Sequence, residues 1–372
     1  MSLSIPQTMI DVTAAWLTAA LREGGVLNAA SVVSESKETI GVGVGILGEL
    51  ARVTLEYDAA EAGAPKAVVV KLPTQDPGGR GVAQLLGFYE KEARIYHELA
   101  PKLAAPRNYY SARDMAAERY VIVMEDVGSV RQGDQVEGAS ATDAELLVRE
   151  MASMHARWWE SPELKALDWL PPLNAPQTLM AQGATMVALE PFLQKFGPDL
   201  TERQRGIAVS LAPRVMSMLQ GLAEGPRTFL HGDLRLDNIF FGSTDGTRPL
   251  TLIDWQISGR GRGPFDIAYF LSQSIDVEAR RANERAWLKD YHQTVTRGVA
   301  GYIWEQCWAD YRAATLLCAV YPIVAGGSID LGNERGVEVV RRMATRSLTA
   351  ITDLDADELL ANYAEQAPLL PG

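Results

Sequence analysis

Cysteine and histidine are scarce in this sequence of 372 residues, which contains two of the first and four of the second. Cys307 and Cys318 are eleven residues apart. On a single helix they would lie roughly 16 Å from each other, which is beyond the reach of a disulfide. The sequence therefore offers no disulfide framework, and we expect a reducing, cytoplasmic setting.

Positive charge and long apolar runs are limited as well. Lys and Arg number 35 against 47 Asp and Glu, which gives a formal net charge of -12. This sign argues against a general affinity for nucleic acids or anionic membranes. The N-terminal residues lack the basic segment and apolar core of a signal peptide. The most apolar stretch, 313–325, is shorter than a bilayer span and contains Pro322, so we expect a buried helix there.

The remaining composition is that of a globular protein, and its length suits two domains. Asp11 and Thr13 precede apolar residues at helical spacing, which predicts a short amphipathic helix. Three segments predict strands: residues 49–57 alternate polar and apolar side chains, and β-branched runs follow at 67–72 and 119–124.

A helical pattern lies between the second and third strand, over residues 85–103. The first domain, residues 1–127, is thus expected to combine an antiparallel sheet with a helix. The second, residues 128–372, is mostly helical in pattern. Thr142 and Glu145 form a possible capping box for a helix that reaches about residue 159.

The strongest chemical signal is the sequence His-Gly-Asp-Leu-Arg-Leu-Asp-Asn at residues 231–238. Phosphoryl transfer needs a carboxylate to accept the proton of the acceptor, and ligands for a metal that neutralises the phosphate. A loop with Asp233 and Asn238 five residues apart can supply both. Asp254 follows an apolar strand sixteen residues later, where a second Mg²⁺ ligand is needed. The alternative interpretation is a polar turn and an Asp that ends a strand.

The motifs HGDLRLDN and LIDWQ resemble those of aminoglycoside phosphotransferase-like kinases, most closely the ecdysteroid-kinase-like and choline-kinase-like branch. The resemblance implies an α+β, bilobal protein-kinase-like fold that uses ATP and Mg²⁺ to phosphorylate a hydroxyl of a small molecule. It makes Asp233 the catalytic base, and Asn238 and Asp254 the Mg²⁺ ligands. His231 would orient the loop, and Arg235 would lie near the γ-phosphate.

A glycine-rich segment precedes the first predicted strand. Gly43, Gly45 and Gly48 match G-x-G-x-x-G, a pattern best known from dinucleotide-binding loops that open a helix. Here a strand follows, which favours a phosphate-covering loop of the kinase type. A flexible hairpin is the alternative.

Lys71 ends the apolar run of the second predicted strand, where a kinase lysine pairs with the α- and β-phosphates and is held by a helix glutamate. Glu92 is the favoured partner and Glu90 the alternative, because helical phase does not decide between them.

Met124, Glu125 and Val127 end the third predicted strand, the segment whose backbone binds adenine in the family. The side chains of Glu125 and Asp126 are expected to be solvated or to cap backbone groups.

Three further features fit less specifically. His155 is expected in the core, and Asp266 as a hydrogen-bond anchor or N-cap. Trp304, Trp308 and Tyr311 share one helix face, where core packing is favoured over an apolar acceptor pocket.

The HGD and DWQ triplets replace the HRD and DFG of protein kinases, which points away from protein substrates. A nucleotide-binding pseudokinase and a Mg²⁺-dependent hydrolase are the competing functions, and the oligomeric state is open.

Overall fold

The computed structural model describes residues 3–41, 48–297, 299, 301–328, 332 and 334–369. Its contacts divide the chain into two compact units. The first comprises Met1–Arg131 and Gly242–Gln256, and the second comprises Gln132–Phe241 and Ile257–Gly372. The chain thus leaves the first unit close to residue 127, where the sequence placed the boundary. The segment that carries Asp254 returns to the first unit, although the sequence division assigned it to the second domain.

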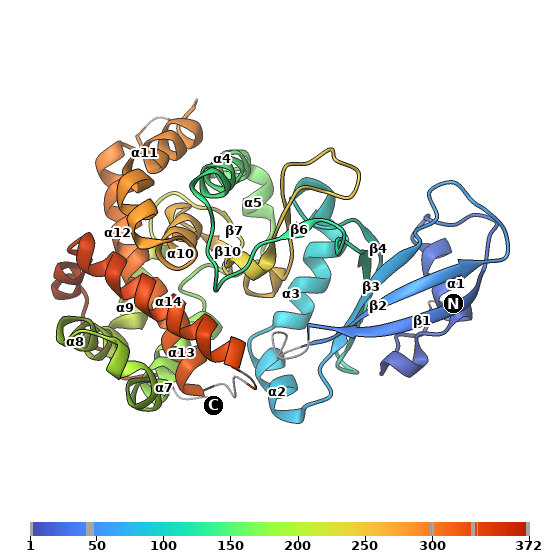
Figure 1. Ribbon diagram of the computed structural model, residues 1–372, viewed down its shortest axis with the longest axis horizontal. Coiled ribbons are helices and arrows are strands. Elements are labelled where there is room, and N and C mark those ends of the chain that lie inside the picture. The colour runs from blue at the N-terminus through green and yellow to red at the C-terminus, as the bar shows by residue number, and fades with distance from the viewer. Residues whose placement is uncertain are drawn as a thin grey trace. The chain divides into compact units, whose positions relative to one another are not determined.

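The first unit is built on an antiparallel five-stranded sheet with the order β1-β2-β3-β5-β4 (Figure 1). Its strands are β1 (Val32–Ile40), β2 (Gly48–Tyr57), β3 (Ala67–Pro73), β4 (Asn108–Asp114) and β5 (Arg119–Glu125). The three strands predicted from sequence correspond to β2, β3 and β5. The sheet gains two more, β1 and β4, whose residues are mostly exposed or half-buried and therefore lack a clear apolar pattern.

Helices cover both faces of this sheet. On one face, α1 (Ala14–Glu23) begins at the N-cap Thr13, as the sequence predicted, and packs Leu17 against a cluster that includes Val70 and Leu72. Because side chains alternate along a strand, Lys71 projects from the opposite face. That face meets α3 (Phe88–Arg94), whose Glu92 contacts Lys71.

The predicted helix over residues 85–103 corresponds to α3 and the turns that extend it, and a separate helix precedes it. A first helix, α2 (Pro77–Leu85), ends before Gly87, which has a left-handed backbone (φ 64°) and separates it from α3. A wider π-helical turn at Ile95–Leu99 and a tighter 3₁₀ turn at Ala100–Lys102 extend α3. The helix α2, which ends where the predicted helix begins, was not predicted from the sequence.

Lys91 on α3 carries a buried charge that destabilises the fold of this unit. It is 7% exposed, its ammonium lies 5.3 Å from the ring centre of Phe88, and no carboxylate of the described residues pairs with it. Burial lowers the pKa of Lys91 to about 8. The folded state therefore carries an unfavourable charge below pH 8, and this cost disappears as the pH rises toward the unfolded value near 10.5.

We expect Lys91→Met to raise the free energy of unfolding at pH 7 by about 3 kcal/mol, because the pKa is lowered from 10.5 to about 8 and about 1.4 kcal/mol accompanies each pKa unit. The gain should shrink between pH 8 and 10. Urea unfolding at several pH values measures both effects. Lys66→Met at an exposed position is the matched control and should change stability by less than about 0.5 kcal/mol. An equal, pH-independent gain in both variants would contradict the assignment.

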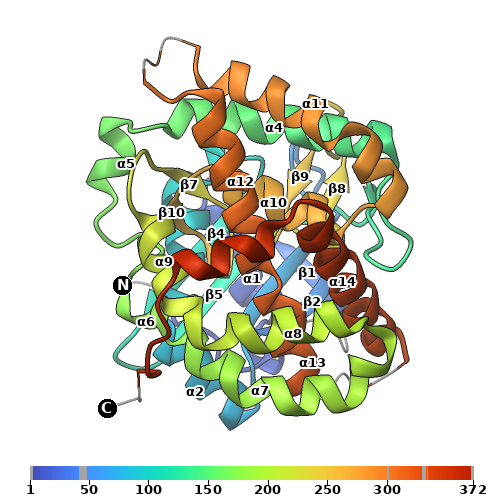
Figure 2. The same ribbon diagram turned by 90° about the vertical axis from the view of Figure 1, so that its left-hand side faces the viewer.

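The second unit is mostly helical. Its helices are α4 (Ala141–Trp158), α5 (Pro162–Ala166), α6 (Pro176–Leu179), α7 (Ala181–Phe196), α8 (Glu202–Leu211), α9 (Val215–Ala223), α10 (Pro264–Gln273), α11 (Val277–Val295), α12 (Trp304–Cys318), α13 (Val320–Ser328) and α14 (Glu334–Asp353). Every residue of α10 is buried, and this helix lies among α4, α11, α12 and α14 (Figure 2). A short strand pair, β7 (Thr228–Leu230) with β10 (Gly259–Gly261), and the strand β8 (Ile239–Phe241) frame the segment 231–238. The predicted α+β class is confirmed.

The start of α4 corrects one sequence prediction. The predicted capping box at Thr142 and Glu145 is wrong, because the helix begins two residues earlier. Its N-cap is Ser140, whose hydroxyl accepts a hydrogen bond from the backbone N–H of Asp143 at 3.1 Å. Thr142 therefore lies inside the first turn, where its own backbone is already helical.

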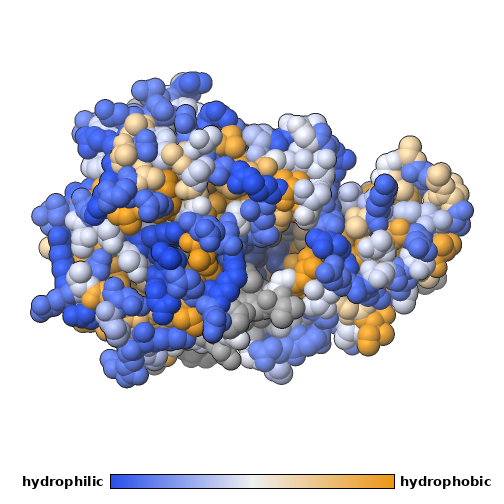
Figure 3. Space-filling view, viewed as in Figure 1, coloured by the Kyte–Doolittle hydropathy of each residue, from blue (hydrophilic) through white to orange (hydrophobic). Residues whose placement is uncertain are grey.

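The apolar stretch 313–325 forms buried helix, as predicted, but it is shared by α12 and α13 and interrupted at Ala319. Pro322 lies in the first turn of α13, where a missing N–H is tolerated. Cys307 and Cys318 are both on α12, buried and free. Over the described residues, no helix has the length and apolarity needed to span a membrane. The face in Figure 3 is mainly hydrophilic, with smaller apolar areas between the charged side chains.

Candidate active site

In the first unit, Lys71 forms a buried ion-pair network. Its ammonium lies 2.7 Å from Oε1 of Glu92 and 3.2 Å from Oδ1 of Asp254. Lys71 and Glu92 are 6% and 1% exposed. The alternative partner, Glu90, is directed to Arg94 instead, at 3.9 Å. The structure thus brings together three residues that the sequence assigned to nucleotide and metal binding, and it selects Glu92 over Glu90.

The network keeps Lys71 charged despite its burial. Burial alone lowers the pKa of Lys71, but the carboxylates of Asp254 and Glu92 outweigh this effect and raise it above the usual value. For Glu92, burial raises the pKa, and the Lys71 ammonium opposes that change. Oε2 of Glu92 is buried without a hydrogen-bond partner among the described residues. The result is a fixed cation whose counter-ions are supplied from α3 and from the end of β9 (Thr251–Leu252).

Asp254 has an unusual backbone conformation. Its φ of 66° places it in the left-handed region, which Asp enters more readily than most residues but still at some energetic cost. The chain around it is held by hydrogen bonds from Leu252 N–H to the carbonyl of Ala104 and from Trp255 Nε1 to the carbonyl of Leu252. Gln256 Nε2 lies 3.3 Å from the second carboxylate oxygen. A strained backbone held in this way is typical of positions where a side chain must point in one direction.

Gly48, the last glycine of the predicted phosphate-covering loop, is the first residue of β2. A Cβ at this position would lie 3.0 Å from Cε of Lys71, closer than a side chain normally allows. The absence of a side chain therefore leaves room for Lys71. Gly43 and Gly45, predicted for the same loop, lie outside the described residues.

Glu125, predicted to be solvated or to act as a cap, is instead buried at 5% exposure. Its carboxylate accepts hydrogen bonds from the hydroxyl of Thr244 and, at 3.0 Å, from the backbone N–H of Arg107; Arg248 lies 3.6 Å away. The expected capping of a backbone group is present in the bond from Arg107 N–H, whereas the alternative of a solvated side chain is wrong, because the segment 242–256 packs on this strand end. Asp126, by contrast, caps Gly128 N–H and pairs with Arg52 at 2.8 Å.

The neighbouring Met124 and Val127 are buried as well. The carbonyl of Val127 accepts a hydrogen bond from Val130 N–H. The side chains of this segment are therefore engaged in the fold, and a ligand would have to be recognised by backbone groups.

In the second unit, Asp233 is held from two sides in the loop between β7 and β8. Tyr269 donates its hydroxyl to Oδ1 at 2.7 Å, and Asn238 donates Nδ2 to Oδ2 at 3.1 Å and to the Asp233 carbonyl at 3.0 Å. Arg235 Nε lies 3.6 Å from Oδ2. Asp233 is 7% exposed. The predicted base, the predicted metal ligand and the predicted phosphate contact are thus brought together within this loop.

Asp266, at the start of α10, anchors the loop as the sequence predicted. Its two carboxylate oxygens accept the backbone N–H groups of His231 (2.8 Å) and Gly232 (2.9 Å), and His155 Nε2 lies 3.3 Å away. His231 is fully buried, and its Nδ1 accepts the N–H of Asp233. Both histidines are therefore structural supports of the loop.

Gly232 explains why this loop has Gly between His and Asp. Its φ is 85°, and a Cβ would lie 2.8 Å from the carbonyl oxygen of Ile257. Both the left-handed backbone and the close approach exclude a side chain. An arginine at this position, as in protein kinases, cannot be accommodated in this loop.

Three residues that support the loop were not predicted from sequence. Tyr269 comes from α10, Gln135 binds the backbone of Leu236 with its side-chain oxygen (2.7 Å), and Arg335 of α14 binds Asp237 at 3.0 Å. Only Tyr269 had a usable signal, since it lies one helical turn after Asp266 and so on the same side of α10. The other two contacts link residues about a hundred positions apart.

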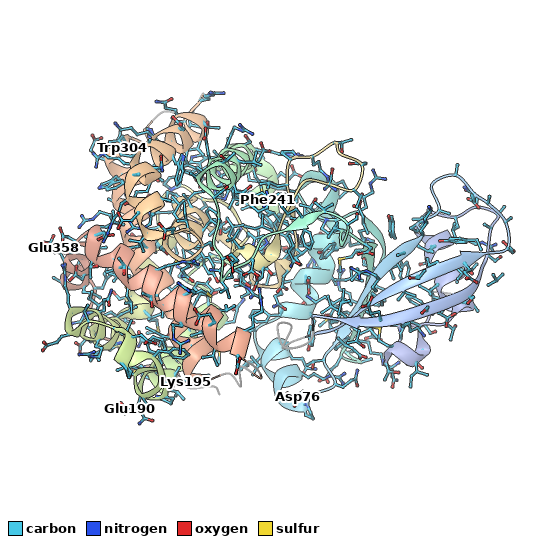
Figure 4. All side chains as sticks on the ribbon, viewed as in Figure 1. Asp76, Glu190, Lys195, Phe241, Trp304 and Glu358 are labelled. Carbon is cyan, nitrogen blue, oxygen red and sulfur yellow. The ribbon has the colours of Figure 1, made fainter. Side chains whose placement is uncertain are left out.

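The aromatic residues of α12 contact charged side chains of α11. Trp304, labelled in Figure 4, is the first residue of α12. Its ring is tilted by 30° against that of Trp308, with ring centres 5.7 Å apart, and the guanidinium of Arg285 on α11 lies 4.8 Å from the Trp308 ring. Tyr311 is buried and donates its hydroxyl to Glu284 at 3.0 Å. Tyr311 thus belongs to the core, as favoured from the sequence, whereas Trp304 and Trp308 are half-buried at the contact of α12 with α11.

The predicted metal ligands have suitable chemistry. Asn238 donates hydrogen bonds from its Nδ2 within the loop, so its side-chain oxygen can serve as a metal ligand. Asp254 supplies a carboxylate. Such oxygen ligands suit Mg²⁺, which also retains water or phosphate oxygens. Among the described residues, no group of three or more His, Cys, Asp or Glu side chains forms a complete metal cage.

Comparison with known proteins settles the family. Residues 63–302 match the model of the "Phosphotransferase enzyme family", a span that includes Lys71, Asp233, Asn238 and Asp254. The chain belongs to this phosphotransferase family. The match confirms the resemblance inferred from the two motifs and the prediction of a small-molecule phosphotransferase. No curated protein sequence matches the chain.

Solved structures agree on the fold. A choline kinase of Cryptosporidium parvum is 12% identical, with a TM-score of 0.53 over 88% of this chain and 90% of its own. A putative aminoglycoside phosphotransferase of Ralstonia eutropha is 18% identical, with a TM-score of 0.50 and coverage of 94% and 98%. A choline kinase of Streptococcus pneumoniae is 18% identical, with a TM-score of 0.50 and coverage of 92% and 99%. The predicted kinase-like fold is confirmed, while identities this low leave the substrate open.

Proposed function

We propose that this phosphotransferase transfers the γ-phosphate of ATP to a hydroxyl group of a small molecule and requires Mg²⁺. The observation that carries the proposal is the burial of the Asp233 side chain and the hydrogen bonds that orient it. Its carboxylate is buried and oriented from both sides by neutral donors, and Arg235 stands next to it. Phosphoryl transfer to an alcohol requires an oriented carboxylate that accepts the proton of the acceptor. It also requires a cation near the phosphate and oxygen ligands for the metal, which Arg235 and the Asn238 amide oxygen can supply.

In this reaction Asp233 accepts the proton of the acceptor hydroxyl as the new bond from that oxygen to the γ-phosphorus forms. The bond between the γ-phosphorus and the β,γ-bridging oxygen breaks, and ADP leaves with the electron pair. Because this transition state involves little covalent chemistry by the protein, positioning and charge stabilisation provide most of the rate.

Lys71 would bind the α- and β-phosphates, with Glu92 fixing its ammonium. Gly48 keeps the space near this ammonium open, and Gly43 and Gly45 would contribute backbone N–H groups. Arg235 would contact the γ-phosphate. Backbone groups of Met124, Glu125 and Val127 would bind the adenine, since the Glu125 side chain is already engaged. Asn238 and Asp254 would hold Mg²⁺, which when bound supplies positive charge to the phosphate oxygens.

Thermal melting with MgATP tests the nucleotide site. A ligand present at a hundred times its Kd adds about 2.7 kcal/mol of stability. We expect a clear upward shift of the wild-type melting temperature that requires Mg²⁺ and is largely lost in Asp254→Ala. Asp114→Ala, which removes an exposed carboxylate from the same unit, is the matched control and should keep the full shift.

The outcomes separate the competing functions. The absence of any shift with MgATP or MgGTP would contradict the proposed nucleotide site. A shift without ADP release, in the presence of a panel of hydroxylated acceptors, would favour a binding-only protein. Release of inorganic phosphate from substrates other than nucleotides, without a nucleotide shift, would favour a Mg²⁺-dependent hydrolase.

A further inference from the structure

Tyr269 is a buried tyrosine whose hydroxyl meets the carboxylate of Asp233. It is 1% exposed, it lies in the middle of the fully buried helix α10, and its Oη is 2.7 Å from Oδ1 of Asp233. Burial, and next the charge of Asp233, raise the pKa of Tyr269 well above the usual value. The hydroxyl therefore stays protonated at neutral pH and acts as a donor.

A second tyrosine fixes the ring of the first. Tyr321 on α13 packs edge-on against Tyr269, with ring centres 4.4 Å apart and planes at 78°. The Tyr321 hydroxyl donates to the carbonyl of Gly232 at 2.7 Å. Tyr269 thus connects α10 to the side chain of Asp233, and Tyr321 connects α13 to the backbone of the preceding residue, Gly232.

The bond from Tyr269 differs from the others that Asp233 receives. Asn238 belongs to the same loop, so its bond moves with the loop, whereas Tyr269 comes from a helix in the core. A carboxylate held from one side only can rotate about its Cβ–Cγ bond. With one donor on each oxygen, the plane of the carboxylate is fixed relative to the core of the second unit.

We propose that Tyr269 is a positioning residue for phosphoryl transfer, which holds the Asp233 carboxylate in the orientation that accepts the proton of the acceptor. This inference rests on the proposed function and adds a residue to it. Tyr269 does not bind nucleotide in this account, and its effect is confined to the turnover step. A loss of positioning by a fraction of an ångström is enough to slow such a step by one to two orders of magnitude.

The test is ADP release from MgATP by the full-length protein, measured with water alone and with the panel of hydroxylated acceptors. We expect Tyr269→Phe to lower kcat about 10- to 100-fold while KM for ATP stays within about twofold, the size of effect that loss of one hydrogen bond to a charged group produces. Tyr311→Phe is the matched control. It also removes a buried tyrosine hydroxyl from a buried carboxylate, that of Glu284, in the same unit.

Both variants lose one such bond, so both should melt at somewhat lower temperature, and only Tyr269→Phe should lose turnover. Unchanged kcat in Tyr269→Phe would overturn the inference, as would an equal loss of kcat in the two variants or a matching rise in KM. A wild-type protein that binds MgATP but releases no ADP would contradict the proposed function itself, and the role of Tyr269 with it. Turnover in the wild type with an unaffected Tyr269→Phe would remove the role of Tyr269 alone.

Discussion

Asp233→Asn should reduce phosphoryl transfer by about 10²- to 10⁴-fold, the range that a positioned general base contributes. The substitution keeps the size of the side chain, and the remaining carbonyl oxygen can still accept the hydroxyl of Tyr269. What disappears is the group that takes the proton of the acceptor. Affinity for MgATP should remain within a fewfold of the wild type, since no nucleotide contact is assigned to Asp233. ADP release and thermal shift measure the two quantities separately.

A suitable control is Asp310→Asn. Asp310 is 2% exposed and accepts bonds from Arg262 and from the hydroxyl of Tyr302 at 2.8 Å, so its loss also disturbs a buried polar network in the second unit. We expect Asp310→Asn to lower stability but to keep kcat at the temperature where the protein is folded. Substantial turnover in Asp233→Asn would disprove its role as the base, and loss of MgATP binding would show that the residue acts in binding.

The residues proposed to act in the reaction were more predictable from the sequence than the residues that hold them in place. Asp233 and Asn238 lie in one short loop, so their spacing alone predicts that both side chains can act at one place. The contact of Lys71 with Asp254 joins residues 183 positions apart and was not predicted from the sequence. Arg335 binds the loop from a helix about a hundred positions away, and no local pattern marks such a contact.

The sequence contained a pattern that distinguishes Glu92 from Glu90 as the partner of Lys71, and the prediction did not use it. Tyr89, Glu92, Ala93 and Tyr96 are all buried and follow the i, i+3, i+4, i+7 spacing of one helix face. Glu92 therefore belongs to the apolar face of α3, whereas Glu90 lies outside it. A charged residue within an otherwise apolar face indicates a buried partner, here Lys71.

The two missed strands illustrate the opposite case. In β1, only Val32 is fully buried, and most of the strand is exposed. Such a strand is determined by pairing with β2 across eight register positions and not by its own apolar pattern. The burial of Glu125 was not predicted for the same reason, because the residues that bury it come from the segment 242–256.

Lys71→Met should be the most damaging substitution for stability and should also abolish turnover. It leaves the buried Glu92 without its 2.7 Å cation, and removing one partner of a buried pair costs about 3 to 5 kcal/mol. Since burial already raises the pKa of Glu92, protonation of this carboxyl should relieve part of the loss. The destabilisation should therefore be smaller at pH 5 than at pH 8, which urea unfolding at the two pH values can measure.

The double variant Lys71→Met/Glu92→Gln separates the structural from the functional role of the pair. It removes both charges and keeps the side-chain volumes, so most of the lost stability should return, as it does when buried ion pairs are replaced by neutral groups. Turnover should not return, because the phosphates would still lack their cation. Recovery of ADP release together with stability would mean that Lys71 serves only to hold α3 on the sheet. Recovery of neither would show that the Asp254 carboxylate, 3.2 Å from Lys71, also depends on this ammonium.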